Sequence, residues 1–451
     1  MRVIIRPQLP LVHPRIDHPH AAELQAISDI IDAKPETVAL VLEDIVPDGV
    51  DVALGRMGMT GEQVLRALIV KQMNGYSYEQ LAFHLADSKT YQAFCRIGVG
   101  DEPPSKSTLQ SNIKRIRPET LEAINRIIVT HAKVVGIESG DKARIDSTVT
   151  ETNIHHPTDS SLLGDCVRVL TRIMHRASKL VEFDFEDHSR RAKHREMEIL
   201  NARTNKDRLD PYKDLLKVTL EVTDDAERAL GALKKCSISV HDTWLQSMSL
   251  VEALEHYIKL SLKIVDQAAR RVVQGQKVPS DEKVVSIFEP HTDIIVKDRR
   301  DTLYGHKICL TGGASNLVLD CVIGDGNPAD SSLATEMIRR LEPIIGKVPR
   351  QASFDGGFAS ADNLDAIKAL GVEDVVFAKR RGIEISDMVK DTWVYKTLRN
   401  FRAGIEGTIS YLKRCFAMDR CTWRGLASFK AYVWSSIISA NLLIMAKHML
   451  A

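Results

Sequence analysis

The chain has 451 residues, of which 44% are apolar and 27% charged, and its formal net charge at pH 7 is +1. This composition is typical of a soluble globular protein, and a chain of this length is expected to form two to four domains. The near-neutral charge means that any nucleic-acid-binding surface must be local. The seven cysteines include no Cys-x-x-Cys pair, which argues against a disulfide framework or structural zinc site and favours a reducing cytoplasm.

Residues 1–54 are predicted to be an N-terminal arm. Their first twenty positions are broken by prolines and histidines and lack the apolar region of a signal peptide. The remainder is only weakly periodic, which leaves open whether this segment is an arm or a dimer contact.

Residues 55–135 follow a helical pattern and are predicted to form a DNA-binding or dimerisation domain. Thr60 is suited to cap a first helix with one apolar face, and Gly75 to end it. A short helix after Ser77 and another over Ser105–Arg115 resemble a helix-turn-helix, although a helical bundle with a solvated polar face is the alternative. The candidate DNA-contacting residues are Lys106, Thr108, Gln110, Asn112, Lys114 and Arg115.

Residues 136–160 are predicted to begin an α/β domain. The alternating, β-branched stretch Ala143–Val149 predicts a strand, with Asp146 near its C-terminal end. Asp159 is expected to cap the helix that follows, although a position beside a site around Asp146 is the alternative. His155 and His156 lack the partner spacing of a transition-metal site.

Residues 161–285 are predicted to be an all-helical insertion. Arginines and lysines recur there at helical spacing, as in Arg168, Arg172 and Arg176, but acids are interleaved with them. Such mixed charge favours a solvated surface over a dedicated binding face.

Residues 286–451 are predicted to complete the α/β domain. Strands are expected over 306–310, 317–323, 351–355 and 375–378, with helices over 330–345 and 401–416. Asp355 ends the third of these strands. Asp320 and Asp325 are its main rivals as a site residue, whereas Asp330 is expected to cap a helix.

The apolar stretch Ala431–Ala446 is the one candidate membrane span. It is short and carries three serines and Asn441, so a buried core helix is the better interpretation and no membrane association is expected.

Acids at the ends of adjacent strands, such as Asp146 and Asp355, can converge on a pair of divalent cations. Two Mg²⁺ ions roughly 3.5–4 Å apart neutralise charge on the attacking and leaving oxygens of a phosphodiester, and carboxylates are their natural ligands. Taken alone, an aspartate at a strand end is more often a turn former.

Glu406 adds a third acid. On a helix, Arg402 and Lys413 share its face to within roughly 40°. A surface salt-bridge ladder is the alternative, but the neighbouring sequence is strongly basic, which suits a DNA backbone. The basic residues are Lys379, Arg380, Arg381, Lys396, Arg399, Arg402, Lys413, Arg414, Arg420 and Arg424.

These residues resemble a known family. The spacing Arg402-x₃-Glu406-x₆-Lys413 is similar to the Y-x₂-R-x₃-E-x₆-K signature of DDE transposases of bacterial insertion sequences, with Arg399 at the tyrosine position. Asp355-Gly-Gly-Phe358 and Arg144-Ile-Asp146-Ser-Thr148 resemble the blocks around the other two catalytic acids. Residues 60–115 are similar to the N-terminal domain of the same family, and ISNCY-like elements are the nearest group.

The resemblance implies a ribonuclease-H-like catalytic core interrupted by the helical insertion. It implies that Asp146, Asp355 and Glu406 are catalytic and bind two Mg²⁺ or Mn²⁺ ions. Arg402 and Lys413 would hold phosphates or a displaced base, on which Trp423 could stack if it is not simply a packing residue.

The implied activity is binding of terminal inverted repeats, followed by metal-dependent DNA cleavage and strand transfer. The implied partners are element-end and target DNA and further copies of the chain, as a homodimer or a larger assembly in the bacterial cytoplasm at the nucleoid. The alternatives are a metal-dependent nuclease without transposition and a non-catalytic DNA-binding regulator derived from a transposase.

Overall fold

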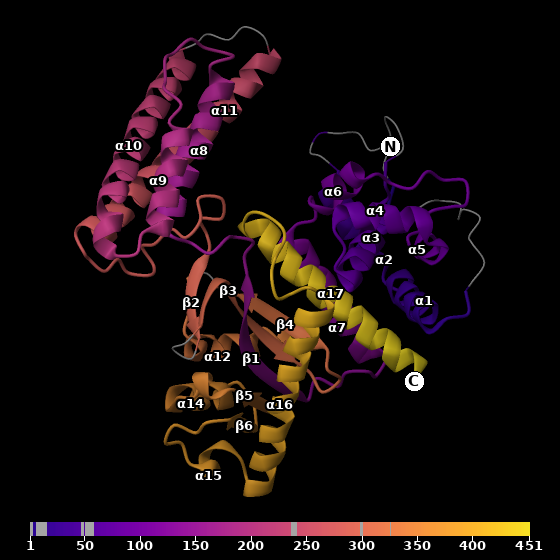
Figure 1. Ribbon diagram of the computed structural model, residues 1–451. Coiled ribbons are helices and arrows are strands. Elements are labelled where there is room, and N and C mark those ends of the chain that lie inside the picture. Colours follow the sequence, from indigo (N-terminus) through magenta and orange to yellow (C-terminus); the bar gives the residue numbers. More distant parts are fainter. Residues whose placement is uncertain are drawn as a thin grey trace. The chain divides into compact units, whose positions relative to one another are not determined.

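The computed structural model describes residues 3–5, 16–46, 49, 58–235, 241–297, 301–324 and 326–451. The chain separates into two compact units. Unit 1 combines Met1–Thr152 with His306–Ala451, and unit 2 consists of Asn153–Gly305. Figure 1 shows the elements of both units coloured along the sequence.

The N-terminal part of unit 1 is helical. Thr60 and Ser77 each form a reciprocal capping box, with Gln63 and Gln80 respectively, and Gly75 ends its helix at a φ of 64°, as the sequence predicts. The helices are α1 (Pro19–Asp32), α2 (Pro35–Ile45), α3 (Gly61–Asn74), α4 (Tyr78–Asp87), α5 (Lys89–Phe94), α6 (Lys106–Ile113) and α7 (Pro118–Val134).

Helix α3 is buried on all sides, not on one face as its pattern predicts. It packs against α2, α4, α6 and the C-terminal helix α17 (Leu426–Leu450). Its Arg66 side chain is fully buried because the guanidinium is bonded to Glu62 at 2.9 Å and to Asp32 at 2.6 Å. The sequence pattern cannot show this, because the partners of α3 come from distant segments.

One mixed sheet organises the α/β part of the chain. Strand β1 pairs in parallel with β5, and β5 with β6, whereas β3 pairs antiparallel with β4; the strand order is β2-β3-β1-β5-β6 with β4 also on β3. The strands are β1 (Lys142–Glu151), β2 (Asp293–Lys297), β3 (Asp301–Gly312), β4 (Val318–Ile323), β5 (Gln351–Phe354) and β6 (Asp374–Phe377).

Two features of the sheet differ from the predicted strands. Strand β1 is longer at both ends than expected, so Asp146 lies in its middle and not near its C-terminal end. Strand β2, which forms a hairpin with the first part of β3, lies within a segment for which no strand is predicted.

Further helices of unit 1 flank the sheet. Helix α16 packs against β1, β5 and β6 (Figure 1). It begins at Thr392, earlier than the predicted Phe401. The predicted helix over 330–345 is divided into two. These helices are α12 (Asp330–Arg339), α13 (Glu342–Ile345), α14 (Ala361–Ala369), α15 (Ile385–Met388) and α16 (Thr392–Cys415), with the 3₁₀ turn η2 (Gly356–Phe358) after β5.

Helix α17 is long and apolar enough to cross a membrane by length and composition, with a mean hydropathy of 1.3 in its most apolar window. However, 83% of that window is buried inside the protein, where α17 packs against α7, α1 and α3. The prediction of a core helix is confirmed.

Unit 2 has its own helical core. Thr158, and not Asp159, caps its first helix; Asp159 is the first helical residue and pairs with Arg271 at 2.8 Å, which corrects the predicted cap. His155 lies 3.7 Å from Asp165. The helices are α8 (Asp159–Ala177), α9 (Ser189–Asn201), α10 (Asn205–Lys235) and α11 (His241–Ala268), followed by the π-helical turn η1 (Ala269–Val273).

Candidate active site

Asp146 and Asp355 are neighbours across two parallel strands. The register pairs Ile145 with Phe354, and Asp146 and Asp355 are the residues that directly follow this pair. Strand β5 ends at Phe354 because Asp355 is followed by the glycines of η2, whereas β1 continues. Adjacent strands lie about 4.8 Å apart, and the two carboxylates therefore start from neighbouring backbone positions.

Glu406 is held over these strands by several contacts of α16. The hydroxyl of Ser353 on β5 donates to the carbonyl of Leu398 at 3.0 Å, and the Arg144 guanidinium on β1 donates to the carbonyl of Phe401 at 3.3 Å. The fully buried Ile405 anchors the underside of the helix. At the far end, the backbone of Glu151 bonds to the segment that follows α16.

The three acids converge on one guanidinium. Arg402 Nη2 lies 3.1 Å from Asp146 Oδ2 and 2.9 Å from Glu406 Oε1, and its Nη1 lies 3.4 Å from Asp355 Oδ1. Residues from β1, from the end of β5 and from α16 thus meet around a single side chain. The structure brings together the three acids that the sequence singles out.

The three acidic side chains differ in their exposure to solvent. The side chains of Asp146, Asp355 and Glu406 are 14%, 38% and 64% exposed. The pKa of Asp146 is raised to about 6, because burial and, to a smaller extent, the neighbouring Asp355 raise it by more than Arg402 and the Ser147 N–H lower it. The Arg402 Nε is buried without a hydrogen-bond partner among the described residues.

The donor set suits a hard divalent cation by its chemistry, since carboxylate oxygens are the ligands that Mg²⁺ and Mn²⁺ prefer. Within the described ranges, no group of three or more His, Cys, Asp or Glu side chains is close enough to hold an ion in the present arrangement. In this arrangement the Arg402 guanidinium contacts all three carboxylates and supplies the positive charge there.

Of the two rival acids, Asp320 has a different role. It is fully buried on β4, where Arg340 donates to both of its oxygens at 2.5 and 3.0 Å. This is a structural ion pair. Asp325 lies outside the described residues.

Asp330 belongs to the site and not to a helix cap. Ala329 occupies the cap position of α12, and the Asp330 side chain makes no capping bond. Instead, Asp330 Oδ1 accepts a bond from the Ser147 hydroxyl at 3.0 Å and lies 3.2 Å from Lys307 Nζ. The predicted cap is wrong because this contact depends on how α12 packs beside β1 and β3, which the local sequence does not contain.

Lys413 does not reach the three acids. Its ammonium lies 3.3 Å from Asp419, at the C-terminal end of α16. Lys379 lies closer to the site, because a Cβ on Gly356, the residue after Asp355, would be only 2.6 Å from the Lys379 Cβ. Most of the basic residues in this part of the chain are exposed: Lys379, Arg380, Arg381, Lys396, Arg399, Arg414, Arg420 and Arg424.

The candidate DNA-contacting residues on and after α6 differ in exposure. Asn112 is buried and donates to the Thr108 carbonyl at 2.7 Å, so it is not part of an exposed face. Lys106 is exposed and lies 3.0 Å from Glu79, and Arg115 donates to the Ile45 carbonyl at 3.1 Å. Lys114 is exposed, whereas Thr108 and Gln110 are half-buried.

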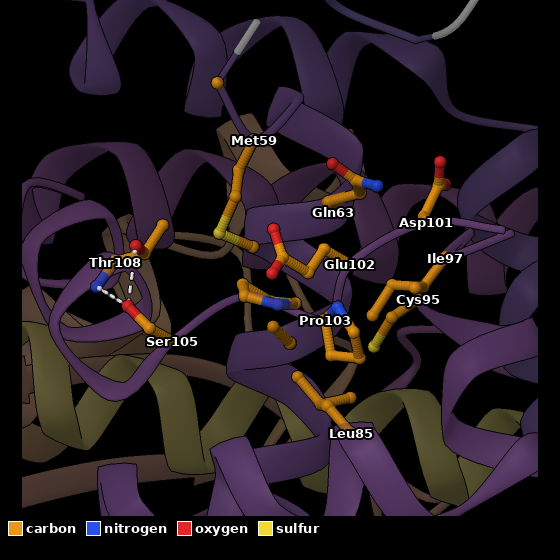
Figure 2. Close-up of a pocket in the computed structure, with 13 residues that line it drawn as sticks. Met59, Gln63, Leu85, Cys95, Ile97, Asp101, Glu102, Pro103, Ser105 and Thr108 are labelled. Atoms are coloured by element: carbon orange, nitrogen blue, oxygen red, sulfur yellow. Dashed lines mark hydrogen bonds between the residues drawn. The ribbon is translucent and has the colours of Figure 1, made fainter.

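A pocket beside α6 is not suited to phosphate. Figure 2 shows its lining, in which Met59, Leu85 and Pro103 are apolar, whereas Asp101 and Glu102 are acidic. Carboxylates repel a phosphate group, which disfavours phosphate binding in this pocket.

Trp423 is a packing residue. It is 5% exposed, and its ring lies against Tyr78 and Tyr432 with centroid separations of 6.5 and 5.5 Å. The Lys71 ammonium lies 5.7 Å from the same ring.

Comparisons with known families match two segments of the chain. Residues 291–442 match the family described as "Transposase DDE domain", and residues 12–115 match "Transposase domain (DUF772)". The first match includes Asp355 and Glu406 but not Asp146. No curated protein and no solved structure matches the chain. The two matches support a transposase of the DDE type, and a DDE domain implies DNA as substrate and a ribonuclease-H-like core.

Proposed function

We propose that this chain is an insertion-sequence DDE transposase that binds the terminal inverted repeats of its element and cuts and joins DNA there. The observation that carries the proposal is the convergence of Asp146, Asp355 and Glu406 on Arg402. Such convergence of acids from distant segments is expected of a phosphoryl-transfer site. The matches to two transposase domain families support the same conclusion.

In this proposal, Asp146, Asp355 and Glu406 hold two divalent cations, Mg²⁺ or Mn²⁺. When bound, these ions supply charge neutralisation at the attacking and leaving oxygens of the phosphodiester. The Ser147 N–H donates to Asp146 Oδ1 at 2.8 Å and fixes the direction of that carboxylate. Partial burial keeps competing water away from Asp146, while the exposed Glu406 leaves the site open to a large substrate.

Arg402 and the surrounding cations bind the DNA backbone in this proposal. The Arg402 guanidinium is the cation nearest to the acids and can form two parallel bonds with a phosphate. Lys379, Arg399 and Lys413 extend the positive surface along and beside α16. The exposed Lys106 and Lys114 are proposed to contact the inverted repeats, with the protein acting as a dimer or larger assembly at the bacterial nucleoid.

The test uses the full chain with duplex DNA carrying the inverted repeats that flank its gene, in Mg²⁺ or Mn²⁺. Wild-type protein is expected to give cleaved and strand-transfer products. Asp146→Asn, Asp355→Asn and Glu406→Gln are each expected to lower cleavage at least 10³-fold while end binding persists, because metal-assisted neutralisation of charge is lost. Asp365→Asn, an exposed acid on α14, is the control and should cleave like wild type.

Each other outcome contradicts a specific part of the proposal. Cleavage that survives in all three acid variants refutes the site. Cleavage without joined products favours a metal-dependent nuclease. DNA binding without uptake of Mg²⁺ or Mn²⁺ favours a non-catalytic regulator.

A further inference from the structure

We infer that Asp330 is a positioning residue of this site, with Lys307 as its counter-ion. Asp330 fixes the position of the β1 segment that carries Asp146 relative to the turn that follows Asp355. The inference rests on the proposed function, because it concerns how the same acids bind divalent cations.

One oxygen of Asp330 connects three elements. Asp330 Oδ1 accepts a bond from the Ser147 hydroxyl at 3.0 Å, and Ser147 is the residue next to Asp146 on β1. The same oxygen lies 3.2 Å from the Lys307 ammonium of β3. Lys307 also donates to the Pro328 carbonyl at 2.7 Å, in the loop that leads into α12. Strands β1 and β3 and the start of α12 are thereby joined at one carboxylate.

The other oxygen of Asp330 faces the turn after Asp355. A Cβ on Gly357 would lie 2.6 Å from Asp330 Oδ2, a separation that real Cβ atoms essentially never show. A side chain at position 357 would therefore displace the Asp330 carboxylate, and glycine lets η2 approach it this closely. Asn363 closes the same corner, since its side-chain amide donates to the carbonyls of Ser331 and Phe358 at 2.8 and 2.9 Å.

This arrangement places a further carboxylate against Ser147, the residue after Asp146, and against the turn that follows Asp355. Like charges close together repel, and among the described residues Lys307 is the cation within ion-pair distance of Asp330. A carboxylate here fits a site for cations, because it adds to the negative potential and restrains two of the proposed ligands. Groups that orient metal ligands typically change metal affinity by about 10–100-fold when they are removed.

The first experiment measures Mn²⁺ binding by the full chain without DNA, using titration calorimetry. Asp330→Ala is expected to weaken Mn²⁺ binding about tenfold or more. Asp330→Asn keeps an oxygen acceptor for Ser147 but loses the charge, so its affinity should lie between those of Asp330→Ala and wild type. Asp362→Ala is the matched control, since Asp362 is an exposed acid in the first turn of α14 and loses the same helix-dipole interaction.

The second experiment titrates Mn²⁺ against cleavage of element-end DNA. In Asp330→Ala the midpoint should move to a higher Mn²⁺ concentration, and saturating Mn²⁺ should restore much of the rate. A structural role alone would lower the maximal rate without moving the midpoint. If Asp330→Ala does not fold, Asp330→Asn is used, and its midpoint should also move to a higher Mn²⁺ concentration.

Unchanged Mn²⁺ affinity and midpoint in the Asp330 variants would overturn the inference, and so would an equal shift in Asp362→Ala. Wild-type protein that binds Mn²⁺ but yields no cleavage products would refute the proposed function, while the calorimetric comparison still decides the role of Asp330. Wild-type protein that takes up no Mn²⁺ would overturn both.

Discussion

At the scale of single residues, the site depends on Arg402, which interacts with three carboxylates that would otherwise repel one another. Its side chain is 15% exposed, and that of Asp146 is 14% exposed. Removing one partner of a buried ion pair costs roughly 3–5 kcal/mol when both are fully desolvated. Because Asp355 and Glu406 are more accessible to water, the expected loss lies near the lower end of that range.

Arg402→Met is therefore expected to lower the free energy of unfolding by about 3 kcal/mol at pH 7.5. The pKa of Asp146 is already raised to about 6, so at pH 5 this carboxyl is largely protonated in the folded wild type and needs the guanidinium less. The destabilisation should thus be smaller at pH 5. Urea unfolding at the two pH values measures it.

Arg399→Met on the same helix is the control, since Arg399 is exposed and should change stability by less than about 0.5 kcal/mol. Equal losses in the two variants, or a loss for Arg402→Met that does not depend on pH, would contradict this account.

Lys71 gives a second prediction at this scale, because it is a 4% exposed ammonium that lies beside the rings of Tyr78 and Trp423. Burial lowers its pKa to about 8 from 10.5. Between these values the unfolded chain still binds the proton and the folded chain does not, so this group makes the protein more stable as pH rises. The full effect is on the order of 3 kcal/mol.

Lys71→Met should remove this pH dependence. The difference in unfolding free energy, wild type minus variant, is expected to increase from pH 8 to pH 10.5, as followed by urea denaturation. Taking the difference cancels the tyrosines and cysteines that titrate in the same window in both proteins. A difference that stays flat across this window would show that Lys71 is solvated in the folded state.

At the scale of elements, α17 is joined to the sheet by a buried amide. Asn441 Oδ1 accepts from the Val318 N–H at 2.9 Å, and its Nδ2 donates to the Val318 carbonyl and to Asn125 Oδ1, both at 2.8 Å. Asn441 and Asn125 are fully buried. The Asn441 side chain thus provides hydrogen-bond partners for the backbone of β4 and for a polar side chain of α7. This explains why a polar residue lies within the apolar helix α17.

Asn441→Leu removes the partner of the Val318 N–H and of Asn125 Oδ1, each at a cost of roughly 1–3 kcal/mol, while the Val318 carbonyl keeps a bond from Asn125 Nδ2 at 3.5 Å. The variant is therefore expected to lower the thermal unfolding midpoint clearly. Ser439→Ala is the matched control, because Ser439 is equally buried on the same helix but its hydroxyl has no hydrogen-bond partner among the described residues. A midpoint for Asn441→Leu as high as that of Ser439→Ala would contradict the role of the amide.

The ends of individual helices could be predicted from the sequence, whereas the packing of one element against another could not. Capping boxes and the αL glycine of α3 are encoded within a few residues, so the helix limits there were predicted correctly. The all-round burial of α3 depends on segments far away in the chain. Strand β2 was not predicted, and its length does not explain this, because the four-residue strands β5 and β6 were predicted.

At the scale of the whole molecule, the candidate site combines what the sequence could and could not predict. The residue types and spacing of the Arg402–Glu406 segment pointed to α16, and strand-end patterns pointed to Asp355. The sequence does not contain the register that pairs Ile145 with Phe354, nor the contact of Asp330 with Ser147. Both arise from tertiary packing, and they determine which acids meet.

Unit 2 separates β1 from its partner β5 in the chain, and this has a consequence for biosynthesis. At roughly 5–20 residues per second, a ribosome needs on the order of 10–40 s to add the intervening residues. Meanwhile unit 2 can begin folding around its own core. Asp146, Asp355 and Glu406, however, cannot assemble until α16 has emerged. A nascent or prematurely terminated polypeptide that lacks α16 would therefore lack the DNA-cutting activity that we propose.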